Sequence, residues 1–128
     1  SNGAVGKISI PAIGVKNYYL WEGETTASMK KGLGHFTGTS VWNGNVAVCG
    51  HNRGAKYVIG SIKDLDVGDK ITYTTSMGTR TYLVETVTKI SSSDWSYLSS
   101  TADNRITLFT CVAGDPSQRW CVQAVQAS

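Results

Sequence analysis

The sequence predicts an all-β domain whose strands form a closed or nearly closed β-barrel. Short runs of β-branched and aromatic residues recur along the chain, separated by Gly, Asn, Asp and Ser. Glycine is frequent, with 14 residues, and proline is scarce, with 2, while helical patterns are confined to short segments. The runs correspond to about seven or eight strands. Closing them into a barrel removes the exposed edges that an open sheet would leave.

Length and composition fit one folded domain. A chain of 128 residues with 41% hydrophobic and 16% charged residues is long and apolar enough to bury a core, which argues against intrinsic disorder. Its 12 basic and 9 acidic residues give a net charge of +3, and no basic run exceeds Lys30-Lys31, so no nucleic-acid surface is expected. No apolar stretch approaches the ~18 residues of a membrane helix. Residues 1–128 are taken as one domain, and Ser1-Asn2-Gly3 resembles a tag remnant or a trimmed start.

Three strands are predicted in the first half of the chain. Residues 7–10 alternate between polar and apolar side chains, and Pro11 ends this run at an edge or turn. Residues 17–21 form a second short strand. Residues 45–49 are almost continuously apolar, which is typical of a strand buried on both faces.

Two further pairs of strands are predicted in the second half: residues 70–75 with 79–89, and residues 105–111 with 119–125. The first pair is joined by Ser76-Met77-Gly78, a hairpin turn. The second pair is joined by residues 112–118, in which Gly114-Asp115-Pro116 predicts the turn.

Helical structure is expected only as short inserts. Residues 25–31 are compatible with one or two turns, with Thr25 or Thr26 as the N-cap and Gly32 as the stop. Residues 55–65 predict another short helical piece. Residues 94–98 follow a run of serines and predict a 3₁₀ turn.

The histidines and cysteines are the first residues to consider for chemistry. His51 follows the most apolar predicted strand, and His35 precedes another predicted turn or strand; an isolated histidine is more often structural than catalytic. The three cysteines, Cys49, Cys111 and Cys121, are too few for the disulfide framework of a small secreted domain. At least one thiol is therefore expected to be free, unless two chains pair through it.

Cys111 is the cysteine best placed for reactivity. It ends the apolar run 107–111, so a rigid strand would hold the residue while its sulfur faces a cleft. A free cysteine is most often a small core residue, but a strand end followed by a turn favours exposure. Arg119 lies eight positions further on, and a hairpin would bring it beside Cys111. Its charge would there favour the thiolate and stabilise an oxyanion.

Residues 107–111, Thr-Leu-Phe-Thr-Cys, resemble the T-L-x-T-C signature of sortases, the cysteine transpeptidases of Gram-positive cell surfaces. Four other segments resemble sortase patterns in the same order: 8–13 (I-x-I-P-x-I), 32–36 (G-x-G-H), 44–51 (G-N-x-x-I-A-G-H, with Cys49 where the family often has a small apolar residue) and 65–71 (L-x-x-G-D-x-I). Arg119 follows the cysteine at the spacing of the family's arginine. The resemblance implies an eight-stranded, mostly antiparallel sortase-like barrel. Its short length favours class D, with class B as the competitor because of the His51-Asn52 pair.

The resemblance also implies a role for each site residue. Cys111 is the nucleophile, His51 the general acid/base, and Arg119 the group that stabilises the oxyanion or positions the substrate. Thr110, the threonine before the cysteine, is expected to help shape the oxyanion pocket. His35 matches a recurrent family histidine without a catalytic role, and we favour a structural one.

The implied reaction cleaves a Thr–Gly-like bond in an LPxTG-type C-terminal sorting signal through a thioacyl-enzyme. An amine acceptor, a peptidoglycan stem or a pilin lysine, then takes the acyl group. The expected partners are surface proteins that carry such a signal, and the catalytic domain is expected to be monomeric. The resemblance places the enzyme on the extracellular face of the membrane, anchored by a segment upstream of this sequence.

Other functions stay open at this point. A thiol hydrolase without a dedicated acceptor would use the same groups, whereas a non-enzymatic β-barrel binding module would not need Cys111, His51 and Arg119 together.

Cys49 is interpreted as a residue that only fills space in its strand. Cys121 lies two residues after Arg119, so it shares that face of the strand and is a possible oxidation partner for Cys111.

No cofactor and no metal are expected. Cys49, His51, Cys111 and Cys121 would supply a Cys₃His set, but they lack the close C-x₂₋₄-C spacing of structural zinc sites. Calcium assists part of the sortase family. The 9 acidic residues of this chain form no obvious loop cluster, so no required calcium is predicted.

Overall fold

Eight strands and three short 3₁₀ helices make up the regular structure of the described residues. A computed structural model describes residues 4–23, 32–50, 59–112 and 115–127, with the backbone only for 111, 112, 115 and 116. The strands are β1 (Ala4–Ile10), β2 (Val15–Glu22), β3 (Leu33–His35), β4 (Asn45–Gly50), β5 (Lys70–Thr75), β6 (Gly78–Ser91), β7 (Arg105–Val112) and β8 (Asp115–Gln126). The 3₁₀ helices are η1 (Pro11–Ile13), η2 (Ile62–Asp64) and η3 (Ser96–Leu98).

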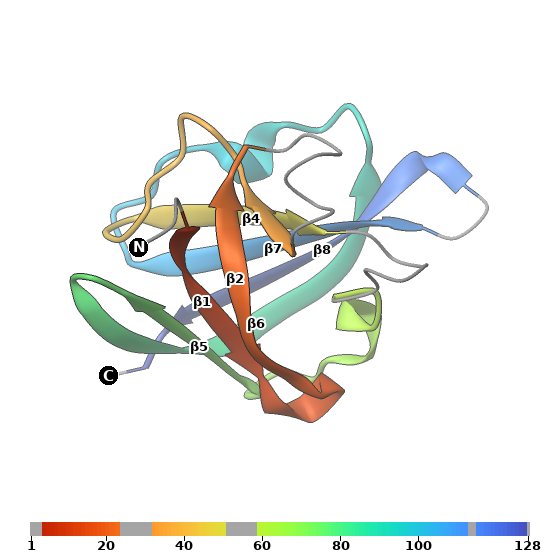
Figure 1. The fold of residues 1–128 in the computed structure, drawn as a ribbon. Helices are drawn as coiled ribbons and strands as arrows, with labels where there is room; N and C mark the ends of the chain where they lie inside the picture. Colours follow the sequence, from red (N-terminus) through yellow and green to blue (C-terminus); the bar gives the residue numbers. More distant parts are fainter. Residues whose placement is uncertain (1–3, 24–31, 51–58, 113–114, 128) are drawn as a thin grey trace.

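The strands close into one barrel in the order β1-β2-β3-β4-β7-β8-β6-β5, with β5 pairing back onto β1 (Figure 1). The predicted all-β barrel is therefore confirmed. The barrel is mostly antiparallel, and the exceptions are the parallel pairs β2–β3 and β4–β7. The pair β4–β7 sets two segments side by side that lie 60 positions apart, as in Gly50 opposite Thr110.

Alternating burial explains why these segments form strands around a common core. In β1, Ile8 and Ile10 are fully buried, and in β5, Ile71 and Tyr73 are fully buried, so every second side chain faces the interior. β4 is buried along its whole length, as its continuous apolar pattern predicted. Its second face is covered because a smaller hydrophobic cluster lies outside the barrel wall. This outer cluster consists of Ala47, Cys49, Ile90, Phe109 and Cys121, with Phe36, Tyr97 and Leu98 packed against it.

Several boundaries differ from the predictions. β3 was not predicted as a strand, since three residues are too few to show a period. Pro11 begins η1 instead of a simple turn, because its fixed φ suits the first helical position. The turn predicted at Gly114-Asp115-Pro116 is wrong for its last two residues, since β8 begins at Asp115. Proline is tolerated there because it stands at a strand start, next to a register irregularity in β7.

The helical predictions had mixed outcomes. The 3₁₀ turn predicted within 94–98 is confirmed as η3. Of the helical piece predicted over 55–65, the described part contains only the single turn η2, since Leu65 is already extended. The rest of that piece, and the whole of the helix predicted at 25–31, lie outside the described residues.

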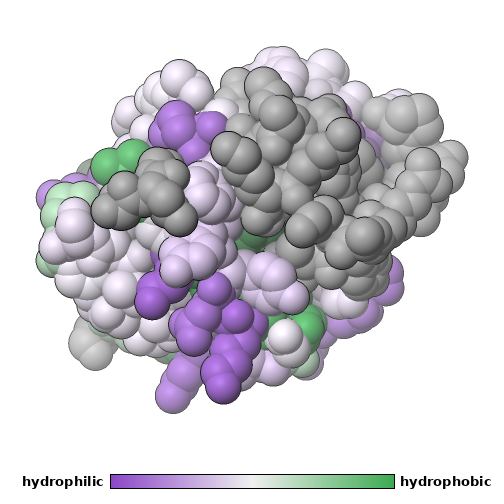
Figure 2. Space-filling view, viewed as in Figure 1, coloured by the Kyte–Doolittle hydropathy of each residue, from purple (hydrophilic) through white to green (hydrophobic). Residues whose placement is uncertain are grey.

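Hydrophobic exposure on the described surface is scattered. Viewed as in Figure 1, the coloured residues are mainly hydrophilic or neutral, and the hydrophobic ones form small separate patches (Figure 2). The large hydrophobic side chains exposed in the described part are Tyr18, Tyr19, Val41, Val67, Met77 and Trp95. No helix among the described residues is long and apolar enough to cross a membrane.

Candidate active site

The ends of β4, β7 and β8 meet at one end of the barrel wall. In the parallel pair β4–β7, Gly50 lies opposite Thr110, and in the antiparallel pair β7–β8, Cys111 lies opposite Arg119. The predicted neighbourhood of Cys111 and Arg119 is thus confirmed for the backbone. His51 lies outside the described residues, but it directly follows Gly50, so the chain enters it from this same edge.

Thr110 ties two of these strand ends together. Its side chain is only 2% exposed, and its Oγ1 donates a hydrogen bond of 3.0 Å to the carbonyl oxygen of Gly50. A hydroxyl has one hydrogen to donate, and this bond uses it. In the structure Thr110 therefore holds the carbonyl that precedes His51, while its predicted contribution to the oxyanion pocket stays a prediction.

Gly50 is required by close packing at the end of β4. A Cβ added to this glycine would lie 2.8 Å from Ile59 Cγ1 and 2.9 Å from Leu33 Cδ2. These distances are shorter than carbon–carbon contact allows. A larger residue would push the strand end outward and displace the point at which the chain continues to His51.

A cavity of about 210 Å³ opens beside these strand ends. Its lining comprises Phe36, Cys49, Gly50, Ile90, Ser91, Ser92, Asp94, Trp95, Phe109, Thr110 and Arg119. The floor is apolar and aromatic, with Phe36 and Phe109 in an edge-to-face pair whose centroids are 5.2 Å apart. Arg119 contributes a cation, and Asp94 an anion. Such a combination suits a peptide side chain held beside a polar reaction centre.

One side of the cavity comes from the end of β6 and the connection that leads to β7. We call Ser91, Ser92, Asp94 and Trp95 the 91–95 wall. Asp94 Oδ1 accepts hydrogen bonds from the backbone N and the Oγ of Ser96, at 3.0 and 2.6 Å, and these bonds lower the pKa of the Asp94 carboxyl. Trp95 is 61% exposed at the rim. Sequence reasoning did not select this wall, although Asp94-x-Ser96 is a recognisable side-chain turn.

His35 is a buried structural residue, as expected. Its Nδ1 lies 3.0 Å from Glu22 Oε1, and its Nε2 lies 2.7 Å from the carbonyl oxygen of Ser40. Glu22 Oε1 and the Ser40 carbonyl are acceptors, so each ring nitrogen donates when it carries a hydrogen; Thr39 Oγ1 also lies 3.1 Å from Nε2. The ring thereby joins the end of β2 to the loop that leads into β4, and it does not line the cavity.

Cys49 and Cys121 lie on either side of Phe109, because both pair with it in register. They are two strands apart, a Cα separation of about 9–10 Å, which exceeds the ~7 Å limit for a disulfide. Cys121 and Cys111 form a diagonal pair across β7 and β8, typically ~7–8 Å apart. An oxidised Cys111–Cys121 pair would therefore need the backbone to move.

Among the described residues, no group of three His, Cys, Asp or Glu side chains is arranged to hold a metal ion.

The buried thiol of Cys121 should make the fold less stable in alkali. Burial, with a smaller contribution from Asp94, raises the pKa of this thiol from 9.0 to about 12. In the unfolded chain the thiol ionises above pH 9, while in the fold it keeps its proton, so stability falls as the pH rises through this window. We expect this thiol to lower the free energy of unfolding by about 1 kcal/mol between pH 8 and pH 10.

Urea unfolding at both pH values measures this effect in the wild type and in Cys121→Ala. Burial also raises the pKa values of Tyr73 and Tyr82, so both proteins should lose stability in alkali. The loss should be smaller in the variant, and equal losses would contradict the assignment to Cys121.

The sequence model of the Sortase domain family matches residues 8–127 of this chain. This range includes every strand-end residue described above. The chain belongs to the sortase family. It is 32% identical over 109 residues to Sortase A of Listeria monocytogenes, covering 84% of this chain and 49% of that protein. It is 31% identical over 121 residues to Sortase A of Bacillus anthracis, and this match covers 92% of this chain and 57% of that protein.

A solved structure gives the same family. Sortase A from Corynebacterium diphtheriae superposes with a TM-score of 0.89 at 26% identity, over 98% of this chain and 61% of that one. The sortase barrel predicted from the sequence is therefore confirmed. The chain spans about half the length of the curated relatives it matches. All three proteins are called Sortase A, so membership of class D stays a proposal.

Proposed function

We propose that residues 1–128 are the catalytic domain of a cysteine transpeptidase. It would cleave the Thr–Gly-like bond of an LPxTG-type C-terminal sorting signal and transfer the new acyl group to an amine. The observation that carries this proposal is the register of β7 and β8. It sets Cys111 opposite Arg119 beside an apolar cavity, at the strand end that leads to His51, in a chain of the sortase family.

The proposed reaction has two halves. The thiolate of Cys111 attacks the threonine carbonyl carbon, and Arg119 donates hydrogen bonds toward the negative charge that develops on the oxygen. The C–N bond breaks as His51 gives its proton to the leaving glycine amine, which leaves a thioester on Cys111. An acceptor amine then attacks the thioester and passes a proton to His51, and the C–S bond breaks to release the ligated product and the thiolate.

The cavity supplies the binding half of the proposal. Its apolar floor, formed by Phe36, Ile90 and Phe109, fits the aliphatic part of a sorting signal. The scissile carbonyl would then lie toward Arg119 at the polar end. Thr110 supports this geometry indirectly, because its hydroxyl fixes the carbonyl of Gly50 in front of His51.

The proposed function also implies donor proteins, an amine acceptor and a place at the cell surface. The donors would be surface proteins with a C-terminal sorting signal, and the acceptor a peptidoglycan stem amine or a pilin lysine. The enzyme would act at the outer face of the cell membrane, held by an anchoring segment outside residues 1–128. Class D remains the class that we propose from the resemblance.

Supplying an acceptor distinguishes the transpeptidase from a thiol hydrolase. We expect an LPxTG-type peptide to yield a ligated product when a short amine-bearing peptide is added, at the expense of the free acid. Mass spectrometry of the products, with and without the amine, measures the ratio of ligation to hydrolysis.

Two controls complete the test. A peptide in which the threonine–glycine pair is inverted should give neither product. Cleavage at a constant rate with no ligated product, at any amine concentration, would favour the hydrolase. Binding of the peptide without any cleavage would favour the binding module.

A further inference from the structure

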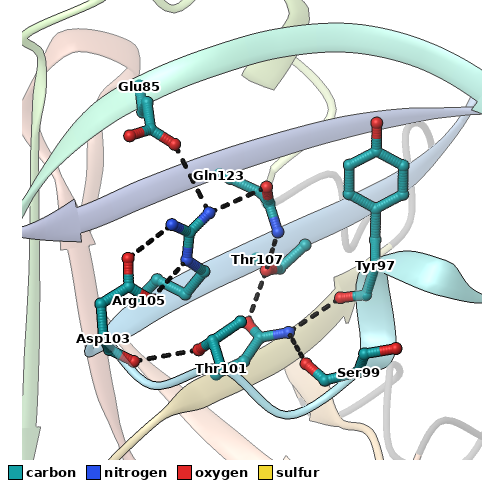
Figure 3. A network of polar contacts seen from close by, with 9 residues as sticks. Glu85, Tyr97, Ser99, Thr101, Asp103, Arg105, Thr107 and Gln123 are labelled. Carbon is teal, nitrogen blue, oxygen red and sulfur yellow. Dashed lines mark hydrogen bonds and ion pairs between the residues drawn. The ribbon is translucent and has the colours of Figure 1, made fainter.

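A chain of polar side chains runs across the outer face of the barrel wall, on β7, β8 and β4 (Figure 3). It begins at Arg105, which forms two hydrogen bonds with Asp103, at 2.9 and 2.6 Å, and an ion pair of 3.4 Å with Glu85. The hydrogen bonds from Arg105 hold the pKa of Asp103 below its usual range. From Arg105 Nη1 a further bond of 3.1 Å reaches Gln123 Oε1.

The inner part of this chain is buried and has a single direction. Gln123 Nε2 donates to Thr107 Oγ1 at 3.1 Å, and Thr107 Oγ1 donates to Asn45 Oδ1 at 2.6 Å. Arginine has only donors, so each following group must accept on one side and donate on the other. This order fixes the amide orientation of Gln123 and of Asn45. Thr107 is completely buried and Asn45 is 3% exposed.

The chain ends on the connection between β6 and β7. Asn45 Nδ2 donates to two backbone carbonyls there, Tyr97 O at 2.8 Å and Ser99 O at 3.1 Å. Figure 3 shows these two carbonyls pointing toward the network from the segment that contains η3. Both hydrogens of the amide are thus used on a segment that lies more than 50 positions away in the sequence.

That segment is continuous with the 91–95 wall of the cavity. Leu98 N donates to Trp95 O at 3.1 Å, and Asp94 accepts two bonds from Ser96, so η3 and the wall form one hydrogen-bonded unit. The other end of the wall is held by the backbone bond from Ser92 N to Ser117 O, at 2.8 Å. The side chain of Asn45 therefore helps to determine where the wall lies, together with the pairing of Ser91 with Gln118 and the packing of Tyr97 and Leu98 against the outer cluster.

We infer that Asn45 is a positioning residue for substrate binding: its amide holds the 91–95 wall against the cavity. This inference rests on the proposed function, because it assumes that the sorting signal binds in this cavity. Both bonds are part-buried, and among the described residues no other hydrogen bond reaches Tyr97 O or Ser99 O. Loss of the amide would leave both carbonyls without these bonds and let the wall move outward. Displacement of a binding group by about 1 Å can lower the rate ~100-fold.

The isosteric variant Asn45→Asp tests this directly. It keeps the shape and the oxygen that accepts from Thr107, but it replaces the donating NH₂ by a second acceptor that faces two carbonyls. We expect kcat/KM for the sorting peptide to fall roughly 10- to 100-fold, mainly through KM, since ground state and transition state lose the same contacts. Amide hydrogen exchange in residues 92–101 should become faster. The rate of Cys111 alkylation by iodoacetamide should stay within a factor of about two, because this small reagent does not use the wall.

Asn104→Asp is the matched control. Asn104 Oδ1 accepts from Gly44 N at 2.8 Å, and its Nδ2 donates to Gln126 Oε1 at 2.8 Å, so the same chemical change removes a donor that does not reach the wall. This variant should keep the peptide KM and the exchange pattern of residues 92–101. Thr107→Val removes the donor to Asn45 and should give a weaker version of the Asn45→Asp effect, while Thr107→Ser should restore the wild-type values.

The possible outcomes separate the two proposals. Unchanged exchange in residues 92–101, or faster exchange with an unchanged KM, would overturn the role of Asn45. If Asn45→Asp does not fold, the comparison of Thr107→Val with Thr107→Ser gives the same answer. If the wild type cleaves none of the sorting peptides, the proposed function fails. The exchange experiment still shows whether Asn45 holds the wall.

Discussion

Cys111→Ala should abolish formation of the thioacyl-enzyme, whereas Cys49→Ala and Cys121→Ala should keep most of the activity. Cys111 is the cysteine that lies opposite Arg119 in the β7–β8 register. Cys49 and Cys121 belong to the outer cluster, and burial keeps the thiol of Cys121 protonated by raising its pKa. Since the thiolate is the nucleophile, a thiol that stays protonated cannot replace Cys111.

An electrophilic peptide mimic measures this. Incubation of the wild type and the three variants, followed by mass mapping of the adduct, should place the label on Cys111 and show no label on Cys111→Ala. Cys49 is the informative control because it lines the cavity but lies on β4. An adduct on Cys49 or Cys121 in the wild type would show that the nucleophile has been assigned to the wrong strand.

The sequence was sufficient for most of the barrel because barrel strands have one face inside and one outside. Alternation in β1 and β5, and the continuous apolar run of β4, are local patterns that survive in the fold. The parallel pairing of β3 with β2 could not be predicted, since β3 has three residues and Gly34 is in its centre. Nor could the pairing of β4 with β7, which depends on packing between segments far apart in the chain.

The candidate site, like the barrel, could be predicted only in part from the sequence. The neighbourhood of Cys111 and Arg119 followed from counting residues along a hairpin, and the register confirms it. The roles of these two residues and of His51 remain predictions from the family resemblance. The positioning role of Asn45 could not be predicted from the sequence, because its partners come from other parts of the chain: Thr107, Tyr97 and Ser99. A motif can mark such an asparagine, but only the folded barrel shows which carbonyls it binds.

Arg119→Lys should lower kcat/KM for the sorting peptide roughly 10²- to 10³-fold, although the charge is kept. The guanidinium is planar and presents a fork of donors, so it can contact a developing oxyanion and a backbone oxygen at the same time. A lysine ammonium is a single point charge on a flexible stem and loses that geometry. Arg119 both lines the cavity and lies opposite Cys111, so the loss would be felt at the reacting carbonyl.

Arg80→Lys is the matched control for this change. Arg80 donates to Trp42 O at 2.8 Å and to Asn43 Oδ1 at 3.2 Å, and its guanidinium lies 4.0 Å from the centre of the Trp42 ring. It does not line the cavity, so the same substitution should lower thermal stability and leave kcat/KM within a few-fold of the wild type. Steady-state kinetics and thermal melting of both variants separate the two effects. If Arg119→Lys stays within a few-fold of the wild type, Arg119 acts only as a distant charge, and the fork of donors has no part in stabilising the transition state.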